Sequence, residues 1–312
     1  MPIRHLGYCC INMTLSENLP KAKQVLTSRT LRQATFSLEK VSALILDNVR
    51  DLYTILQWNK QHDIYLFRIS SEIFPFMDHP TLGYKLEDLS HCDSIKSILK
   101  NCGDFAKQHG IRLTSHPGPY NCLGSPNSDT ILKTILSLNM HALLGELLGV
   151  DFNINIHVGG SYDGDFIGTA KRFNDNYAKL SDSAKKWLTV ENDDKASMWD
   201  INNLYELIHK QIGIPIVMDL HHWNFCNRGD IKADFQMAMD TWQSNTIPKI
   251  HYSESRNSAN SNIVDKCKPQ AHSDFILNIV PDYSDRLYDC MFECKAKDKA
   301  LLLYRAKLLN AA

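Results

Sequence analysis

The stretch VMDLHHW, Val217 to Trp223, decides the fold. An apolar run typical of a buried β-strand ends there in Asp219, and His222 follows three residues later. A carboxylate is costly at the end of a buried strand unless it is paired, because an isolated buried charge loses its hydration. The meaning of this stretch therefore depends on whether other apolar runs in the chain end in the same way.

Apolar runs of strand length recur along the whole chain, and each is rich in Ile, Val, Leu, Phe or Tyr. They cover residues 3–9, 64–70, 111–116, 152–158, 186–192, 214–220, 248–254 and 288–294. Most of the intervening segments have apolar residues at helical spacing. These predicted helices cover residues 94–110, 128–149, 198–213, 233–245 and 295–312, and residues 20–62 have room for two more.

The ends of the predicted helices carry the expected signals. Ser128 or Asp129 is the expected N-cap of one helix, and Gly110, Gly149 and Gly213 follow the last turns of three. Strands that alternate with helices predict parallel βαβ units. Eight such units favour one closed (β/α)8 barrel, a TIM barrel, over an open sheet, and we expect a single domain over residues 1–312.

Composition and charge limit the class of protein and the kinds of partner that are expected. With 312 residues and 44% hydrophobic content, the chain can bury a large core without disulfides. The formal net charge is −1, so any binding of nucleic acid must rest on a local basic patch. Nine cysteines without metal-type spacing indicate free thiols in a reducing compartment. No signal peptide or long apolar run is apparent, so we expect an intracellular protein that does not span a membrane.

A barrel brings the carboxyl ends of its strands to one face, where active sites lie. From the third strand to the eighth, each run ends in a histidine or a carboxylate. These residues and their close followers are His116, His157, Glu191, Asp219, His222, Lys249, His251, His272 and Glu293. Any one of them alone is as easily a core residue. The series indicates divalent metals such as Zn²⁺ or Mn²⁺, with Glu191 placed to bridge two ions.

At this point the chain resembles a known family. The segments LGYCCIN (6–12), FRISSEIFPFMDHP (67–80), TSHPGPY (114–120), NIHVGG (155–160), LTVENDD (188–194), VMDLHHW (217–223), KIHYSE (249–254), AHSDF (271–275) and MFECKAKDKA (291–300) resemble those of the UV-damage endonucleases. The resemblance covers essentially the whole chain in the right order. A more distant likeness extends to endonuclease IV and to xylose-isomerase-like barrels.

The resemblance implies an ATP-independent repair nuclease built as a TIM barrel. Such an enzyme nicks the damaged strand of duplex DNA immediately 5′ to cyclobutane pyrimidine dimers and 6-4 photoproducts, with some action on abasic sites. The implied cofactor is a cluster of two or three divalent ions, typically Mn²⁺, with Zn²⁺, Co²⁺ and Mg²⁺ left open. We expect a monomer whose partner is damaged DNA.

The resemblance also implies a role for each strand-end residue. One metal position uses His116, His157 and the bridging Glu191; a second uses Glu191, Asp219, His251 and Glu293; a third uses His222 and His272. In the family, the lysine matching Lys249 is carboxylated and gives an oxygen ligand. His79 matches a histidine near the reacting phosphate, so Glu191, Lys249 and His79 are the expected catalytic residues.

Lesion recognition is where the chain departs from the family pattern. Tyr8, Asn12 and Tyr120 match residues that contact the lesion, but Pro119 replaces the family glutamine. Because proline has no side-chain amide, base probing there is lost or moved to Asn121. Candidate phosphate contacts are Lys195, Arg228, Arg256, Lys266 and Lys268.

Three other functions remain open from the residues. A barrel with histidine and carboxylate ligands can be a sugar isomerase or epimerase, which also uses paired divalent metals. The lost glutamine also allows an abasic-site endonuclease of the endonuclease IV type. A silent metal-binding or lesion-binding protein is the third, although the intact ligand set argues against it.

Overall fold

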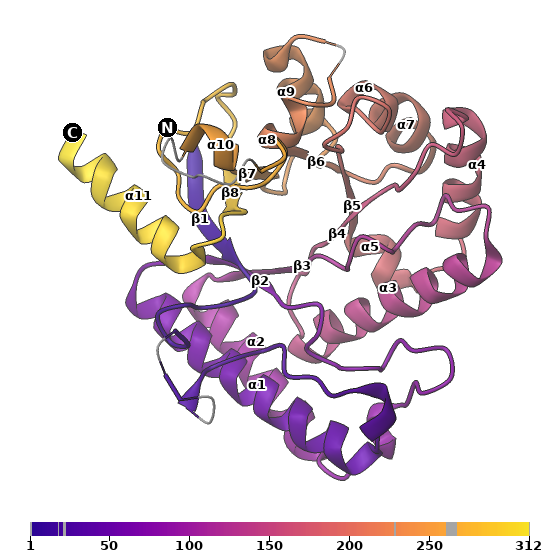
Figure 1. Ribbon diagram of the computed structural model, residues 1–312, viewed down its shortest axis with the longest axis vertical. Helices are drawn as coiled ribbons and strands as arrows, with labels where there is room; N and C mark the ends of the chain where they lie inside the picture. Colours follow the sequence, from indigo (N-terminus) through magenta and orange to yellow (C-terminus); the bar gives the residue numbers. More distant parts are fainter. Residues whose placement is uncertain (1, 18, 21–22, 228, 260–266, 312) are drawn as a thin grey trace.

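The strands form a closed, fully parallel barrel in chain order, as predicted (Figure 1). This computed structural model describes residues 2–17, 19–20, 23–227, 229–259 and 267–311. The strands are β1 (Ile3–Cys9), β2 (Leu66–Ile69), β3 (Arg112–Ser115), β4 (Ile154–His157), β5 (Leu188–Glu191), β6 (Ile216–Asp219), β7 (Lys249–Tyr252) and β8 (Tyr288–Phe292). All eight predicted strands are therefore confirmed, each shorter than or equal to its apolar run.

The two ends of the chain close the barrel. Strand β1 pairs with β8, so that Tyr8 lies opposite Phe292. Near the start of β8, the buried carboxylate of Asp289 accepts hydrogen bonds from two arginines. Its Oδ2 lies 2.6 Å from Arg4 Nη2 and 2.8 Å from Arg112 Nη1. One carboxylate thus joins the starts of strands β1, β3 and β8.

Helices cover the outside of the barrel (Figure 1). They are α1 (Leu38–Gln61), α2 (Cys92–His109), α3 (Ser128–Leu148), α4 (Phe166–Tyr177), α5 (Asp182–Trp187), α6 (Ile201–Leu204), α7 (Lys210–Ile212), α8 (Leu220–Trp223), α9 (Ile231–Asp240), α10 (Arg256–Ala259) and α11 (Lys297–Ala311). Helices α1, α2 and α3 pack in succession, and α11 packs against β1 and β8. Most of the longer helices begin after a side chain that caps their first backbone N–H groups.

Helices α2 and α3 approach unusually closely at Gly103. A Cβ atom at this position would lie 1.6 Å from the carbonyl oxygen of Leu148, a distance at which no side chain fits. Both helices end at a left-handed glycine as predicted, Gly110 with φ 68° and Gly149 with φ 63°. Glycine is favoured there because it has no Cβ to clash at positive φ.

Several predicted helix boundaries were wrong. Asn127, not Ser128 or Asp129, caps α3, because its side chain reaches the N–H groups of Asp129 and Thr130 at 2.9 and 3.0 Å. Within residues 20–62, the described part (20 and 23–62) holds one long α-helix, α1, after a short 3-10 turn at Gln33–Thr35, and not two.

The remaining differences lie in the second half of the barrel. The segment 198–213 begins its helix at Ile201 and widens into a π-helical turn at Tyr205–His209. Helix α9 ends at Asp240, five residues before its predicted end. Helices α4 and α5 were not predicted, although Phe166, Ala170 and Phe173 recur at helical spacing along α4.

Helix α3 is the one helix of the described residues that is long and apolar enough to cross a membrane, and half of its most apolar window is buried within the protein. It packs between α2 and α5 as a barrel helix. All nine cysteines have free thiols, as expected.

Candidate metal centre

The predicted strand-end residues converge at one mouth of the barrel. The register of the strands sets them side by side: His157 on β4 lies opposite Glu191 on β5, and Asp219 on β6 lies opposite His251 on β7. Glu191, Asp219 and His251 have no exposed surface. The barrel therefore buries carboxylates and imidazoles next to each other.

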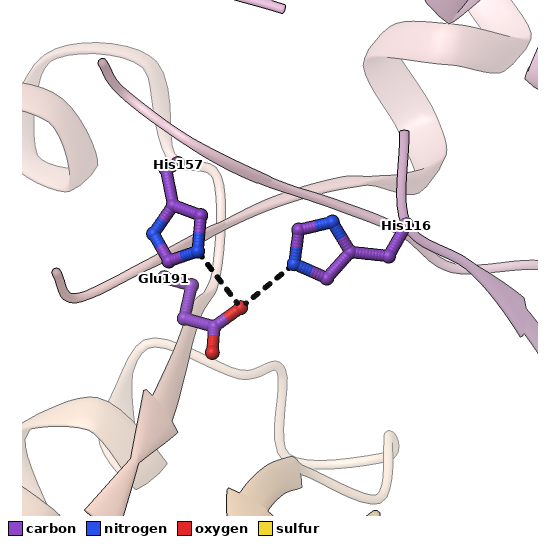
Figure 2. Close-up of side chains that lie close together, drawn as sticks. All are labelled: His116, His157 and Glu191. Atoms are coloured by element: carbon purple, nitrogen blue, oxygen red, sulfur yellow. Dashed lines mark hydrogen bonds and ion pairs between the residues drawn. The ribbon is translucent and has the colours of Figure 1, made fainter. Parts of the chain in front are cut away.

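The first group consists of His116, His157 and Glu191. Both histidines direct their Nε2 atoms at the same carboxylate oxygen (Figure 2). Glu191 Oε2 lies 3.2 Å from His116 Nε2 and 3.8 Å from His157 Nε2. The ligand-type atoms of the three residues lie within 4.8 Å of one another, close enough to bind one ion together.

The other oxygen of Glu191 belongs to two further groups. Its Oε1 lies 2.9 Å from His251 Nδ1, which is also 3.0 Å from Glu293 Oε1. The same Oε1 lies 3.7 Å from His222 Nδ1, and His222 Nε2 is 3.9 Å from Asp219 Oδ2. Glu191 is thus common to all three groups, and the structure places Asp219 with His222 as well as beside His251.

The spacing of Asp219 and His222 has a local cause. Strand β6 ends at Asp219, which caps the short helix α8 by accepting from the backbone N–H of His222 at 2.8 Å. One helical turn then returns the His222 side chain to the strand end. His221 points away and bonds the carbonyl of Gln270 through Nε2 at 3.0 Å.

His272 lies next to this third group. Its ring centroid is 5.6 Å from that of His222, and its Nδ1 is 2.6 Å from Ser253 Oγ. The structure therefore brings together every strand-end residue predicted as a ligand, with Lys249 fully buried on β7.

The electrostatics of the centre favour positive charge. Burial alone would raise the pKa of Glu191, but His251 and His157 hold it well below its usual range. Burial opposes protonation of His222, yet Asp219 and Glu191 raise its pKa to about 9. His157 differs, since burial lowers its pKa to about 4.

Lys249 is an uncharged amine for part of the time at neutral pH. Burial lowers its pKa to about 7, and the nearby Arg112 and Arg68 act in the same direction. Its Nζ has no hydrogen-bond partner. A neutral buried amine is a nucleophile, which a lysine ammonium is not.

The residues fit a centre of divalent ions. Asp219 Oδ2 and His251 Nε2 are buried at the mouth without hydrogen-bond partners. Buried polar atoms without partners are costly, and a cation satisfies a carboxylate oxygen and an imidazole nitrogen together. Mixed histidine and carboxylate donors suit Zn²⁺, Mn²⁺ and similar ions, so the donor set alone does not select one.

Sequence reasoning missed three polar residues around the centre. Asn155 donates to Glu191 Oε2, and Arg68 pairs with Glu293. Asn192 holds strand β6 through two bonds with the backbone of Asp219, at 2.8 and 3.0 Å. Asn155 alone had a visible signal, since it lies two residues before His157 and so on the same face of β4.

A cavity of about 970 Å³ lies beside the candidate lesion-binding loop. Its lining includes His79, Pro119, Tyr120 and Asn121. Tyr120 is 87% exposed, whereas the Asn121 amide donates to the Gly118 carbonyl of its own loop at 2.9 Å. One N–H of the Asn121 amide is thus engaged within the loop, and a role for Asn121 in base probing stays a prediction.

Tyr8 and Asn12 are buried and bonded to each other. The Tyr8 hydroxyl donates to Asn59 at 2.7 Å and accepts from Asn12 at 2.9 Å. Both side chains have no exposed surface, so contact with DNA requires them to leave these bonds.

The candidate phosphate contacts are dispersed. Lys195 and Lys268 are exposed, and Arg256 lies 3.5 Å from Asp274. Arg228 and Lys266 lie outside the described residues.

Fold and site together define a TIM barrel with a buried histidine–carboxylate centre of the kind that binds divalent metals. The family model described as UV-endonuclease UvdE matches residues 4–311. The chain therefore belongs to the UV-endonuclease family, as the sequence motifs indicated.

Individual relatives agree with this assignment. The chain is 35% identical, over 98% of its length, to the "UV-damage endonuclease" of Schizosaccharomyces pombe. It spans about half of that relative, 51% of its length. The crystal structure of SacUVDE matches with a TM-score of 0.81 and 29% identity, covering 98% of this chain and 99% of that one. Endonuclease IV from Thermus thermophilus is alike in fold alone, with a TM-score of 0.55 and 14% identity over 83% of this chain and 94% of that one.

Proposed function

We propose that this chain is a metal-dependent endonuclease that nicks duplex DNA immediately 5′ to UV photoproducts. The observation that carries the proposal is the position of Glu191, one buried carboxylate shared by three groups of metal-ligand type. The family and its UV-damage endonucleases supply the substrate. Residues 1–312 would act as one catalytic domain and as a monomer, and the nine free thiols favour an intracellular setting.

The ligand roles follow the three groups. His116, His157 and Glu191 would hold one ion; Glu191, Asp219, His251 and Glu293 a second; His222 and His272 a third. When bound, divalent ions supply Lewis-acid polarisation of a phosphodiester and neutralise its leaving oxygen. The carboxylates of Glu191, Asp219 and Glu293 would also orient an attacking water by accepting hydrogen bonds from it.

His79 would bind the phosphate as a hydrogen-bond donor. Its Nδ1 accepts from the backbone N–H groups of Thr81 and Leu82 at 3.2 and 3.1 Å, so the ring proton lies on Nε2. An Nε2–H group on the wall of the cavity can donate to a phosphate oxygen. Tyr120, Pro119 and Asn121 form the adjacent surface for the lesion and its opposite bases.

Lys249 would be carboxylated. Its neutral Nζ would form an N–C bond to CO₂, and the displaced proton would pass to solvent. Burial and the lowered pKa, about 7, support this reaction. Intact mass under native conditions with ¹³C-bicarbonate should show one added carboxyl group that a Lys249→Met protein lacks; an unlabelled wild-type protein would contradict it.

The test is a nicking assay on a duplex labelled in one strand. One duplex carries a single thymine dimer and another an abasic site, each with Mn²⁺ or with EDTA. A Mn²⁺-dependent cut immediately 5′ to the dimer supports the proposal. A cut only at the abasic site would replace it with an abasic-site endonuclease, and no cut at either would remove the nuclease assignment.

Glu191→Ala tests the centre in the same assay. It removes the shared ligand, so cleavage should fall below detection, while Glu39→Ala, an exposed carboxylate on α1, should cut like the wild type. Near-normal turnover of Glu191→Ala with unchanged metal content would exclude the role given to Glu191.

A further inference from the structure

The two ring nitrogens of His157 have different surroundings. Its Nε2 faces Glu191 Oε2 at 3.8 Å. Its Nδ1 is buried and makes no hydrogen bond, and Asp193 Oδ1 is an ion-pair neighbour at 3.4 Å. A neutral imidazole that binds a cation through Nε2 carries its proton on Nδ1, and that N–H group needs an acceptor. Asp193 supplies an acceptor at this position.

Asp193 is itself held in place. Its Oδ2 accepts from the backbone N–H of Trp199 at 3.3 Å, and its own N–H donates to the Trp199 carbonyl at 2.9 Å. Trp199 has no exposed surface and Asp193 is 7% exposed. The loop after β5 therefore presents a fixed carboxylate oxygen to His157.

Three of the other candidate ligand histidines have a neutral partner at Nδ1, whereas His251 Nδ1 faces the candidate ligands Glu191 and Glu293 at 2.9 and 3.0 Å. His116 lies 3.0 Å from the carbonyl of Pro117, His222 lies 3.0 Å from the carbonyl of Asn192, and His272 lies 2.6 Å from Ser253 Oγ. Each of these contacts fixes a ring by a carbonyl or hydroxyl group. His222 Nδ1 also lies 3.7 Å from Glu191 Oε1, but Glu191 is itself a candidate ligand. Among the five candidate ligand histidines, His157 is the one whose Nδ1 faces a carboxylate that is not a candidate ligand.

We propose that Asp193 is a positioning residue that keeps the proton of His157 on Nδ1 and directs Nε2 toward the ion shared with His116 and Glu191. A carboxylate behind an imidazole makes the opposite nitrogen a stronger donor to a cation. Asp193 would not touch the substrate. The inference rests on the proposed metal centre, but it does not depend on which DNA lesion is cut.

Metal affinity without DNA is the test. Wild type, Asp193→Asn, Asp193→Ala and the control Asp194→Asn are stripped of metal and titrated with Mn²⁺ by calorimetry. Asp193→Ala should lose about 10- to 100-fold in affinity at one site with the other sites unchanged. Asp193→Asn keeps one acceptor oxygen, which can face His157 although the bond from the Trp199 N–H is then lost, so it should lose less affinity than Asp193→Ala. Asp194→Asn changes a neighbouring carboxylate and should bind like the wild type.

The tautomer of His157 gives a second measurement that a merely structural role would not change. In the Zn²⁺-loaded protein, ¹⁵N spectra should place the His157 proton on Nδ1 in wild type and in Asp193→Asn. Folded Asp193→Ala with unchanged Mn²⁺ affinity would overturn the proposal, as would an equal loss in Asp194→Asn. A wild type that binds no divalent ion would overturn it too. Normal wild-type binding without DNA nicking would leave the effect of Asp193 measurable and would contradict only the proposed nuclease.

Discussion

Tyr120 is almost fully exposed on the loop that follows β3, beside the cavity that His79 also lines. An aromatic ring in this position contributes little to the free energy of folding, because its surface remains in water. It can gain by stacking on a base, which contributes about 1–3 kcal/mol. We therefore assign its value to binding and not to stability.

Tyr120→Ala should weaken binding to dimer-containing DNA by about 5-fold or more and leave binding to undamaged duplex nearly unchanged. The reason is that a damaged pair opens more easily and offers an unstacked base to the ring. Fluorescence anisotropy with both duplexes measures the two affinities. An equal loss on both would show that Tyr120 contacts DNA without discriminating the lesion.

His141 is a buried histidine on α3 with both ring nitrogens unpartnered. Burial lowers its pKa to about 3, while the unfolded chain titrates near 6.5. The folded pKa is depressed, so its stabilising effect is fully present above about pH 6.5 and falls as the pH drops toward 3. At pH 5, His141 therefore lowers the free energy of unfolding by about 2 kcal/mol relative to neutral pH.

His141→Gln should remove this part of the acid sensitivity. Urea unfolding at pH 7.5 and pH 5.0 gives the free energy of unfolding of each protein, and the variant should lose about 2 kcal/mol less than the wild type between the two. Comparing two proteins cancels the contribution of the remaining histidines. Identical losses would mean that His141 is protonated in the folded state.

At the scale of elements, sequence patterns predicted the barrel well and its connections less well. The strands were found because each is a short apolar run, and six of the eight runs end in a histidine or a carboxylate. The π-helical turn at Tyr205–His209 lies inside a segment predicted as helical, because apolar spacing does not separate a π-helical turn from an α-helical one. Helices α4 and α5 were missed, although Phe166, Ala170 and Phe173 of α4 do recur at helical spacing. Arg68 and Asp193 were missed for another reason: the residue type shows a charge, but the partner depends on neighbouring strands and loops.

The contact of α2 with α3 gives a prediction at this scale. Gly103→Ala would bring a methyl group into the carbonyl of Leu148, so the helices must separate. The free energy of unfolding should fall by about 3 kcal/mol or more. Ser97→Ala on the exposed face of α2 is the matched control and should change it by less than about 0.5 kcal/mol. Equal free energies of unfolding for the two variants in urea would show that α2 and α3 can separate at little cost.

At the scale of the whole molecule, metal binding at the candidate centre would stabilise the fold, because the proposed ligands lie on or next to strands β3 to β8. Mn²⁺ at 100 times its dissociation constant should stabilise the folded state by about 2.7 kcal/mol per site. For a chain of this size, this corresponds to a rise of the melting temperature by roughly 4 °C per site over the EDTA-treated protein. Differential scanning fluorimetry measures it. Glu191→Ala should show less than half the rise, and a full rise in that variant would place the stabilising ion elsewhere.

The pairing of β1 with β8 also governs when the barrel and its candidate metal centre are first complete during synthesis. The barrel cannot close until the ribosome has released Tyr288–Phe292, and Glu293 follows directly. A nascent chain therefore carries most of the histidines long before it has a complete centre. Synthesis itself would delay any cutting of DNA until the last strand is in place, and a prematurely terminated chain would lack both barrel closure and a ligand.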